Sequence, residues 1–363
     1  MAKKFIIDIF KPPDFKLAEL NFDYPNAITE KKFIYASKGR YALYHILKSL
    51  DIKDKILVPA YVCSSILEPI RKLKISPIFY DLDIEDLNAN LDSIIFLSKK
   101  YNVKTVLVAS MYGNPANLVE IEKFCSQNKI KLIDDAAQSF GAKIGNRFVG
   151  TFGDAGFISF SAGKPTAGHM GSFFWTNNTE YNFVRTKHHF FHYLSYLDFY
   201  FNRYQIYKYK KFEIFKILSI FKKIFERIFD ITNDDISSFE DKILGGALKA
   251  VLKEEFGFRK EYFSNFVNEF KDNIFFRVIK SLRGDPHNYK FVILFGEKTT
   301  AENFIKHLFK NKIYCLKGYK LLTDDLVYLP NSQKIDGRVI EIPIEDDESK
   351  MDYLFEVVEK FKT

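Results

Sequence analysis

The sequence is poor in cysteine and has no long uninterrupted apolar run. Its three cysteines, Cys63, Cys125 and Cys315, are far apart and odd in number, which predicts neither a disulfide framework nor a zinc ribbon. No stretch approaches the ~18 apolar residues that would span a bilayer. The N-terminal apolar run is broken by Asp8 and Lys11, and no small-residue cleavage site follows it, so a signal peptide is not predicted. We therefore expect a cytoplasmic protein.

Charge of one sign is only in modest excess. The formal net charge is +8 over 363 residues, which favours attraction to anionic small molecules or surfaces and predicts no nucleic-acid partner. A hydrophobic fraction of 47% and 39 phenylalanines supply ample core. The length exceeds that of one typical domain and favours one large and one small domain.

Between residue 33 and about residue 178, short β-rich runs alternate with longer helical runs. The predicted strands are 55–61, 76–83, 103–112, 130–137 and 155–161, and the predicted helices are 40–50, 62–73 and 117–128. Such alternation is typical of an α/β domain whose mainly parallel sheet is covered on both faces. Ligands of such sheets gather at the carboxyl ends of the strands.

The pattern predicts two domains. Residues 1–257 would form the large domain, with a helical insertion near 180–235, and residues 258–363 would form a smaller C-terminal α/β domain. In the smaller domain we expect strands at 287–296 and 337–344 and helices at 300–311 and 350–361.

One lysine, in the segment "ISFSAGKPT" at 158–166, is the first candidate for chemistry. A phosphate-binding loop of the Walker type is excluded, because Pro165 follows Lys164 and Ile158 stands where the first glycine would be needed. The Ser161-x-x-Lys164 spacing matches a serine–lysine nucleophile pair, yet its partner motifs are missing. An ordinary surface lysine and a cofactor-anchoring lysine remain as alternatives.

The residues around Lys164 favour a lysine that anchors pyridoxal 5'-phosphate. That cofactor needs an acidic residue at its pyridine nitrogen, a helix N-terminus for its phosphate, and nearby hydroxyls. Asp134 and Asp135 lie at a predicted strand end, the turn at 36–43 opens a helix, and Ser159 lies close to the lysine. Each signal is weak alone, and their order along one α/β domain strengthens the interpretation.

Five segments carry a resemblance to a known family. They are "KGRYALYHILKSLDI", "VPAYVCSS", "YGNPANL", "LIDDAAQSFGA" and "GTFGDAGFISFSAGK". In order and spacing they resemble the motifs of the DegT/StrS-type sugar aminotransferases, which are fold-type I pyridoxal-phosphate enzymes. The similarity covers roughly residues 30–180. It implies the same fold for this chain, a large domain with a mainly parallel sheet followed by a smaller C-terminal α/β domain.

The resemblance also implies roles for single residues. Lys164 would be the Schiff-base lysine and the proton shuttle, and Asp135 would pair with the pyridine nitrogen. Gln138 would lie against the phenolic oxygen side of the cofactor. Cys63 stands where the family stacks an aromatic ring on the cofactor, and the neighbouring Tyr61 leaves the stacking residue unassigned.

The resemblance places the cofactor phosphate at the start of a helix. Gly39 and Arg40 would supply main-chain N–H groups, joined by the hydroxyl of Ser159. Arg40 replaces the family's usual small hydroxyl residue, so its guanidinium either adds a contact to the phosphate or points away. The family's E-G-G-A segment reads "HMGSFFW" at 169–175, which indicates divergence on the substrate side.

The implied activity is a pyridoxal-phosphate-dependent aminotransferase, expected to be a homodimer. It would move an amino group, with glutamate as expected donor, to a keto-sugar nucleotide or another phosphorylated ketone in surface-glycan biosynthesis. A pyridoxal-phosphate-dependent decarboxylase of a small (phosphorylated) amino acid and a catalytically idle cofactor-binding protein at the membrane surface are the alternatives. The dehydratases of the family carry histidine in place of the lysine, so Lys164 argues against that branch.

Two further features lie in the predicted helical insertion of the large domain. Residues 206–229 predict a basic amphipathic helix, which either contacts an anionic membrane or packs on the protein body or a dimer interface. His188 and His192 have metal-compatible spacing, yet no third ligand accompanies them, so no metal site is predicted. With Arg185 and Lys187 they could instead contact a phosphorylated substrate.

Overall fold

The computed structural model describes a large part of the chain. The described residues are 5–8, 31, 33–36, 38–160, 163–165, 171–181 and 257–362. The amphipathic helix predicted at 206–229, the residues at 185, 187, 188 and 192, and almost all of the insertion predicted near 180–235 lie outside them.

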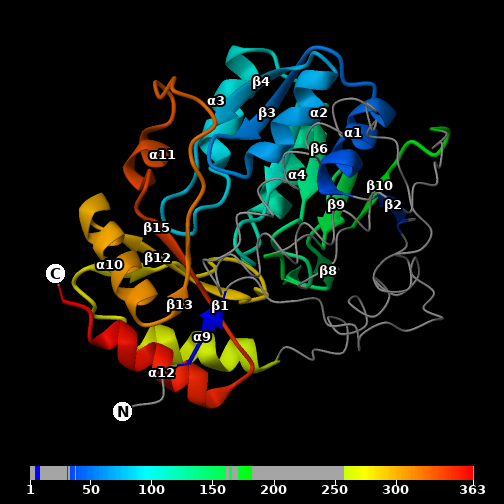
Figure 1. The fold of residues 1–363 in the computed structure, drawn as a ribbon. Helices are drawn as coiled ribbons and strands as arrows, with labels where there is room; N and C mark the ends of the chain where they lie inside the picture. Colours follow the sequence, from blue (N-terminus) through cyan, green and yellow to red (C-terminus); the bar gives the residue numbers. More distant parts are fainter. Residues whose placement is uncertain are drawn as a thin grey trace, which may run out of the picture.

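A seven-stranded sheet forms the centre of the larger unit (Figure 1). In sheet order its strands are β2 (Ile34–Ala36), β10 (Ser172–Thr176), β9 (Ala155–Ser159), β6 (Lys131–Asp135), β5 (Thr105–Ala109), β3 (Lys55–Pro59) and β4 (Ser76–Tyr80). All pairings from β9 to β4 are parallel, whereas β10 pairs antiparallel with both β9 and β2. Each of the five predicted strands contains one observed strand, and the predicted mainly parallel sheet is confirmed.

Helices cover both faces of this sheet. They are α1 (Gly39–Ser49), α2 (Leu67–Lys72) after the short η2 (Ser64–Ile66), α3 (Leu91–Lys100) and α4 (Leu118–Gln127). The apolar residues of α1 and α2 join one hydrophobic cluster and those of α3 and α4 join another, so the two pairs lie on opposite faces. Helix α3 was not predicted from the sequence. It begins after Asn90, whose side chain accepts a hydrogen bond from Ser93 N at 2.8 Å.

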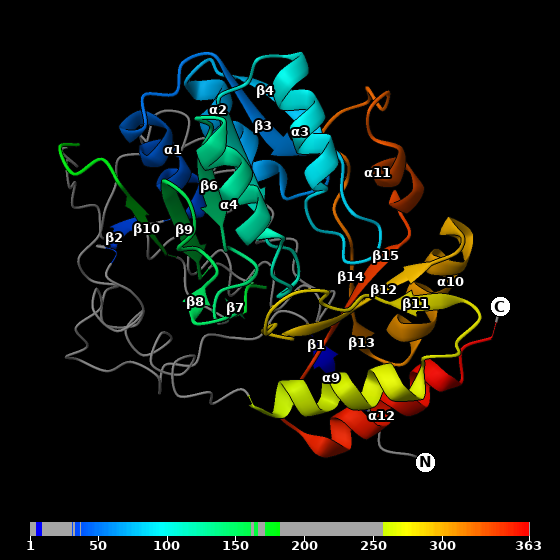
Figure 2. The ribbon, with the colours of Figure 1, turned by 180° about the vertical axis from the view of Figure 1, so that it is seen from behind.

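The C-terminal residues build a second, smaller sheet. Its strands, in sheet order, are β11 (Phe276–Val278), β12 (Lys290–Phe295), β15 (Val339–Pro343) and β14 (Leu316–Lys317), all antiparallel. The helices of this unit are α9 (Gly257–Glu269), α10 (Lys298–Lys310), α11 (Pro330–Ile335) and α12 (Glu348–Glu359). Helices α9 and α12 lie side by side against the sheet in both views (Figures 1 and 2). The predicted strands and helices of this region overlap the observed ones, and the exact domain boundary remains a prediction.

Short strands complete the structure. They are the pair β7 (Lys143–Ile144) and β8 (Arg147–Phe148), and the pair β1 (Ile7–Asp8) and β13 (Ile313–Tyr314). The parallel pairing of β1 with β13 attaches the start of the chain to the C-terminal unit, where Ile7 joins its hydrophobic cluster. Of the helices within the described ranges, none is long and apolar enough to cross a membrane.

The two faces of β12 belong to different cores. Phe291 and Ile293 pack into the cluster with α9, α10 and α12, while Val292 and Leu294 join the cluster of the larger unit. Alternation of side chains along a strand produces this division. Lys290 is two residues before Val292 and therefore lies on the same face of β12. The start of this strand thus directs a charged side chain toward the larger unit.

Candidate active site

The predicted site residues meet at one edge of the large sheet. Because β3, β5, β6 and β9 are parallel, their carboxyl ends lie at the same edge. Asp135 ends β6 and Ser159 ends β9, while Met111 lies just beyond β5. Lys164 follows β9 and is half-buried. Helix α1 starts from the same edge, because β2 runs in the direction of β9.

The two neighbouring carboxylates of β6 have different surroundings. Successive side chains of a strand point to opposite faces. Asp134 Oδ2 accepts hydrogen bonds from Gly150 N at 2.6 Å and Phe152 N at 3.0 Å, so this carboxylate holds the 150–152 turn. Asp135 Oδ1 accepts one from Ala137 N at 2.8 Å. Of the two, Asp135 is the carboxylate whose charge acts on Lys164.

Burial moves the pKa values of Asp135 and Lys164 toward each other. It raises the pKa of Asp135 to about 6, opposed by the hydrogen bond from Ala137 and by the charge of Lys164. Burial likewise lowers the pKa of Lys164, opposed by nearby Cys63 and Asp135 and reinforced by Lys290. A lysine with a lowered pKa has a larger neutral fraction, and only the neutral amine attacks a carbonyl carbon.

These buried carboxylates predict a pH-dependent stability of the cofactor-free protein. The pKa of Asp135 is about 6 when folded and 3.8 in its ordinary state, so the folded state binds more protons between these values. The contribution of Asp135 to the free energy of unfolding is therefore largest at low pH, where the carboxyl is protonated in both states. It is lost as the pH rises from about 4 to 6, because the unfolded state then ionises more readily than the folded state. At about 1.4 kcal/mol per pKa unit the loss is about 3 kcal/mol.

Replacing Asp135 by asparagine should remove this dependence. We expect the free energy of unfolding of Asp135→Asn, relative to the unsubstituted protein, to rise by up to about 3 kcal/mol between pH 4 and pH 8. Urea unfolding of the cofactor-free proteins at several pH values measures it. Asp54→Asn, at an exposed carboxylate, is the control and should show no such trend. A pH-independent difference for Asp135→Asn would contradict the assigned burial.

The start of α1 and the end of β9 form a small cradle. A Cβ atom at Gly39 would lie 3.4 Å from both Cβ and Oγ of Ser159, so the glycine brings the first helical turn close to this hydroxyl. The first turn holds no acidic residue, and the N-cap residue Lys38 makes no side-chain cap hydrogen bond within the described part. Main-chain N–H groups at a helix N-terminus attract anions such as phosphate.

The side chain of Arg40 lies in an ion pair rather than in this cradle. Its guanidinium pairs with Glu68 of α2. Of the two alternatives drawn from the sequence, this ion pair favours the one in which the guanidinium is directed elsewhere.

Gln138 and Cys63 complete the set of predicted residues. Gln138 is buried, with Nε2 3.4 Å from Met111 Sδ and Oε1 accepting a 3.5 Å hydrogen bond from Tyr289. Cys63 is half-buried, precedes η2, and has Sγ 3.2 Å from Ser65 Oγ. The predicted residues are therefore spread over three strand ends and one helix start around Lys164.

Tyr61 is the neighbour of Cys63 that the sequence offered as a second candidate for stacking on the cofactor ring. In the structure its side chain contacts other aromatic side chains. Its hydroxyl lies 2.7 Å from that of Tyr112 and accepts a hydrogen bond from Tyr319 N at 3.2 Å. The rings of Tyr112 and Tyr319 are stacked with centroids 6.1 Å apart. These tyrosines connect the end of β3 to the segment after β14.

Sequence reasoning missed the residues that the smaller sheet contributes. Lys290 Nζ lies 2.5 Å from Glu341 Oε2, both side chains are 3% exposed, and the ammonium lies 4.4 Å from the centroid of the Tyr289 ring. The charges of this pair act on Lys164. A signal existed, because each of the two predicted strands carried one charged residue within an apolar run.

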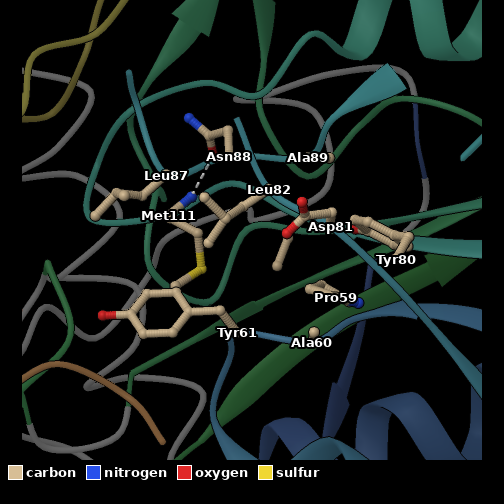
Figure 3. Close-up of a pocket in the computed structure, with 11 residues that line it drawn as sticks. Pro59, Ala60, Tyr61, Tyr80, Asp81, Leu82, Leu87, Asn88, Ala89 and Met111 are labelled. Atoms are coloured by element: carbon tan, nitrogen blue, oxygen red, sulfur yellow. Dashed lines mark hydrogen bonds between the residues drawn. The ribbon is translucent and has the colours of Figure 1, made fainter. Parts of the chain in front are cut away.

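A small cavity lies beside these residues, at the ends of β3, β4 and β5 (Figure 3). Tyr61, Asp81, Asn88 and Met111 are among its lining residues. Its volume is about 10 Å³, which is close to the least space that holds one water molecule. It is therefore too small for a substrate. Within the described ranges no cluster of histidine, cysteine or carboxylate side chains is arranged to hold a metal ion.

Comparison with known proteins identifies the family. The sequence model of the DegT/DnrJ/EryC1/StrS aminotransferase family matches residues 24–204. The chain belongs to this family. The match includes Lys164, Asp135 and every other predicted site residue, and the family resemblance described from the sequence is confirmed.

Several curated relatives of this DegT-family chain are nucleotide-sugar enzymes by name. GDP-perosamine synthase of Escherichia coli O157:H7 is 30% identical over 146 residues, which are 39% of each protein. GDP-4-keto-6-deoxy-D-mannose 3-dehydratase of Escherichia coli O55:H7 is 34% identical over 106 residues, which are 29% of this chain and 27% of the relative. The chain thus aligns with less than two-fifths of the length of these relatives.

Solved structures show the same fold over nearly the whole chain. The aminotransferase TlmJ of Streptoalloteichus hindustanus superposes with a TM-score of 0.71, 16% identity and 98% coverage of both chains. The Escherichia coli GDP-4-keto-6-deoxy-D-mannose-3-dehydratase superposes with a TM-score of 0.68 and 20% identity, over 92% of this chain and 89% of that one. The predicted fold class is confirmed.

Proposed function

We propose that this DegT-family chain is a pyridoxal-phosphate-dependent aminotransferase that moves an amino group from glutamate to the ketone of a nucleotide sugar. The single observation that carries the proposal is the position of Lys164 and Asp135 at the same carboxyl edge of a parallel sheet, where the charge of each acts on the other. Burial lowers the pKa of the lysine and raises that of the carboxylate.

The described residues fit pyridoxal phosphate. Lys164 supplies a primary amine for covalent attachment, and Asp135 supplies a buried carboxylate with one main-chain partner. The start of α1 at Gly39, close to the hydroxyl of Ser159, offers N–H groups and a hydroxyl for a phosphate. Gln138 lies between these groups and the smaller sheet. Amine, carboxylate and anion cradle thus match the three chemical parts of the cofactor.

Each residue would have one task. Bound pyridoxal phosphate supplies an electron sink for negative charge developing on a substrate carbon. Asp135 would hold a proton at the pyridine nitrogen, which that sink requires. Lys164 Nζ would hold the cofactor and then carry a proton from the α-carbon of the amino donor. Gly39, Arg40 N–H and Ser159 would fix the phosphate and thereby the orientation of the ring.

The substrate class follows from the relatives. Two of them are named UDP-N-acetyl-3-dehydro-alpha-D-glucosamine 3-aminotransferase and dTDP-4-dehydro-2,3,6-trideoxy-D-glucose 4-aminotransferase, and both names describe a ketone on a nucleotide sugar. Another relative is named a lipopolysaccharide biosynthesis protein. These names support a keto-sugar nucleotide as amino acceptor and a role in surface-glycan biosynthesis. Glutamate as donor and a homodimeric assembly are implied by the family resemblance alone.

Two other outcomes compete with amino transfer. One relative is a dehydratase by name, and the family resemblance associates dehydration with histidine in place of the lysine, so Lys164 favours amino transfer. Decarboxylation of a small amino acid uses the same cofactor and the same lysine. The half-reaction with an amino donor separates decarboxylation from amino transfer, and the product formed from the acceptor separates amino transfer from dehydration.

The decisive experiment adds glutamate to the purified, cofactor-loaded protein without any ketone. We expect the yellow colour of the bound cofactor to bleach and one equivalent of 2-oxoglutarate to appear. A panel of keto-sugar nucleotides should then restore the colour for the true acceptor. Release of carbon dioxide instead would establish decarboxylation, and a stable colour with every amino acid tested would leave only cofactor binding.

A further inference from the structure

Helix α9 of the smaller unit reaches the loop that carries Lys164. Arg259 lies in the first turn of α9, is 7% exposed, and its Nη1 donates a hydrogen bond to the carbonyl oxygen of Pro165 at 2.9 Å. The two residues are 94 positions apart in the sequence. The main chain immediately after Lys164 is therefore attached to a different structural unit.

The main chain around Lys164 is restricted on both sides. Gly163 has φ of +76°, a left-handed conformation that favours glycine. Lys164 precedes a proline, which disfavours the helical conformation for its backbone. Pro165 has a fixed φ and no N–H, so its carbonyl is its one main-chain hydrogen-bonding group. The bond from Arg259 takes that carbonyl and fixes the remaining direction of the loop.

His287 supports Arg259 from the other side. Arg259 Nη1 lies 3.3 Å from His287 Nε2. A guanidinium only donates, so Nε2 accepts and the ring proton is on Nδ1. Burial lowers the pKa of His287 well below its ordinary value, and the charge of Arg259 adds to this, so the ring is neutral. Burial also lowers the pKa of Arg259 to about 9, which leaves it protonated at neutral pH.

His287 also connects this contact to the large sheet. Its main-chain N–H donates to the carbonyl oxygen of Gly113 at 2.9 Å, in the turn after β5. Gly113 has φ of +90°, and a Cβ there would lie 3.3 Å from Asn288 N, so the turn and the 287–288 segment are in close contact. The Lys164 loop, α9 and the turn after β5 are thus joined through one guanidinium.

We propose that Arg259 is a positioning residue for Lys164. Through its hydrogen bond to Pro165, Arg259 fixes the position of the lysine loop relative to the smaller unit. This inference rests on the proposed function of Lys164 as the cofactor-anchoring lysine. Loss of the bond would leave the Lys164 amine present but misplaced. A misplacement of about 1 Å at a reacting group costs about 10²-fold in rate, so the effect on chemistry should exceed the effect on folding.

The test compares Arg259→Met with a matched control, Arg277→Met. Arg277 also connects the two units through main-chain carbonyls, since it donates to Ile84 O at 2.6 Å and Glu85 O at 3.1 Å, and these contacts do not involve the Lys164 loop. Both variants lose an inter-unit arginine. Only Arg259→Met loses one beside the lysine.

Three readouts separate positioning from stability. They are the rate of cofactor fixation on Lys164 by borohydride, the pH at which the colour of the bound cofactor changes, and the rate of the glutamate half-reaction. In Arg259→Met we expect a shifted colour transition and a 10- to 100-fold slower half-reaction. Arg259→Lys, which keeps one donor and the charge, should recover most of the rate. Arg277→Met should change thermal stability alone.

The outcomes are distinguishable from failure of the proposed function. If the unsubstituted protein never forms a borohydride-stable adduct, the proposed function fails first. If it forms the adduct and folded Arg259→Met matches Arg277→Met in all three readouts, the positioning role is overturned. Should Arg259→Met fail to fold, Arg259→Gln, which is too short to keep the contact, takes its place with the same expectations.

Discussion

Replacing Lys164 by alanine is expected to abolish covalent attachment of the cofactor and to slow amino transfer by about 10⁴-fold or more. Proton transfer by a positioned side chain alone contributes about 10²–10⁴-fold. Lys164→Ala loses that contribution together with the nucleophilic amine. Mass spectrometry of borohydride-treated protein measures attachment, and 2-oxoglutarate release from glutamate measures the rate.

Two variants control this experiment. Lys164→Arg keeps a positive charge yet offers no amine that can attack a carbonyl at neutral pH, so it should be as inactive as alanine. Lys260→Ala removes an exposed lysine of α9 that pairs with Asp285, and it should retain attachment and rate. An adduct of the same mass in Lys164→Ala, fixed on another lysine, would overturn the assignment of the anchoring residue.

Four of the predicted site residues are local in the chain. Asp135, Gln138, Ser159 and Lys164 lie within 30 positions of one another, at or just after two strands that the sequence pattern predicted. Parallel pairing then brings these strand ends together without further information. The local pattern therefore predicts where these strands end, and the roles of the single residues come from the family resemblance.

The contacts that were missed are long-range. The hydrogen bond of Arg259 to Pro165 joins residues 94 apart, and that of Tyr289 to Gln138 joins residues 151 apart. Arg259 and Tyr289 both fit the local sequence pattern around them. No signal in the sequence therefore indicates that either residue makes a long-range contact. The Lys290–Glu341 pair was partly predictable. A charged residue inside an apolar strand indicates that it has a buried partner, but the sequence does not identify that partner.

The fold shows the same division. Helix α3 was missed although its N-cap is sequence-encoded, because the preceding "DLDIEDLNAN" is rich in polar residues and obscures where the periodicity begins. The antiparallel pairing of β10 with β9 was also missed, because a short apolar run such as "SFFW" carries no signal of strand direction. Edge position and strand direction are set by packing across the sheet rather than by the strand itself.

Replacing Asp135 by asparagine is expected to preserve covalent attachment while slowing the glutamate half-reaction by about 10²–10⁴-fold. Asparagine has a similar shape and still accepts the hydrogen bond from Ala137 N, but it has no charge to keep the pyridine nitrogen protonated. Borohydride trapping should therefore remain near the level of the unsubstituted protein. Stopped-flow absorbance after mixing with glutamate measures the rate.

The neighbouring carboxylate provides a matched control for this prediction. Asp134→Asn makes the same chemical change one residue away, on the opposite face of β6, where the side chain accepts from Gly150 N and Phe152 N. We expect it to lower thermal stability while the rate per cofactor-loaded molecule falls less than about tenfold, because Asp134 has no contact with the reacting groups. If Asp134→Asn slowed the half-reaction more than Asp135→Asn, the two carboxylates would have been assigned the wrong way round, and with them the face of the sheet on which the cofactor ring lies.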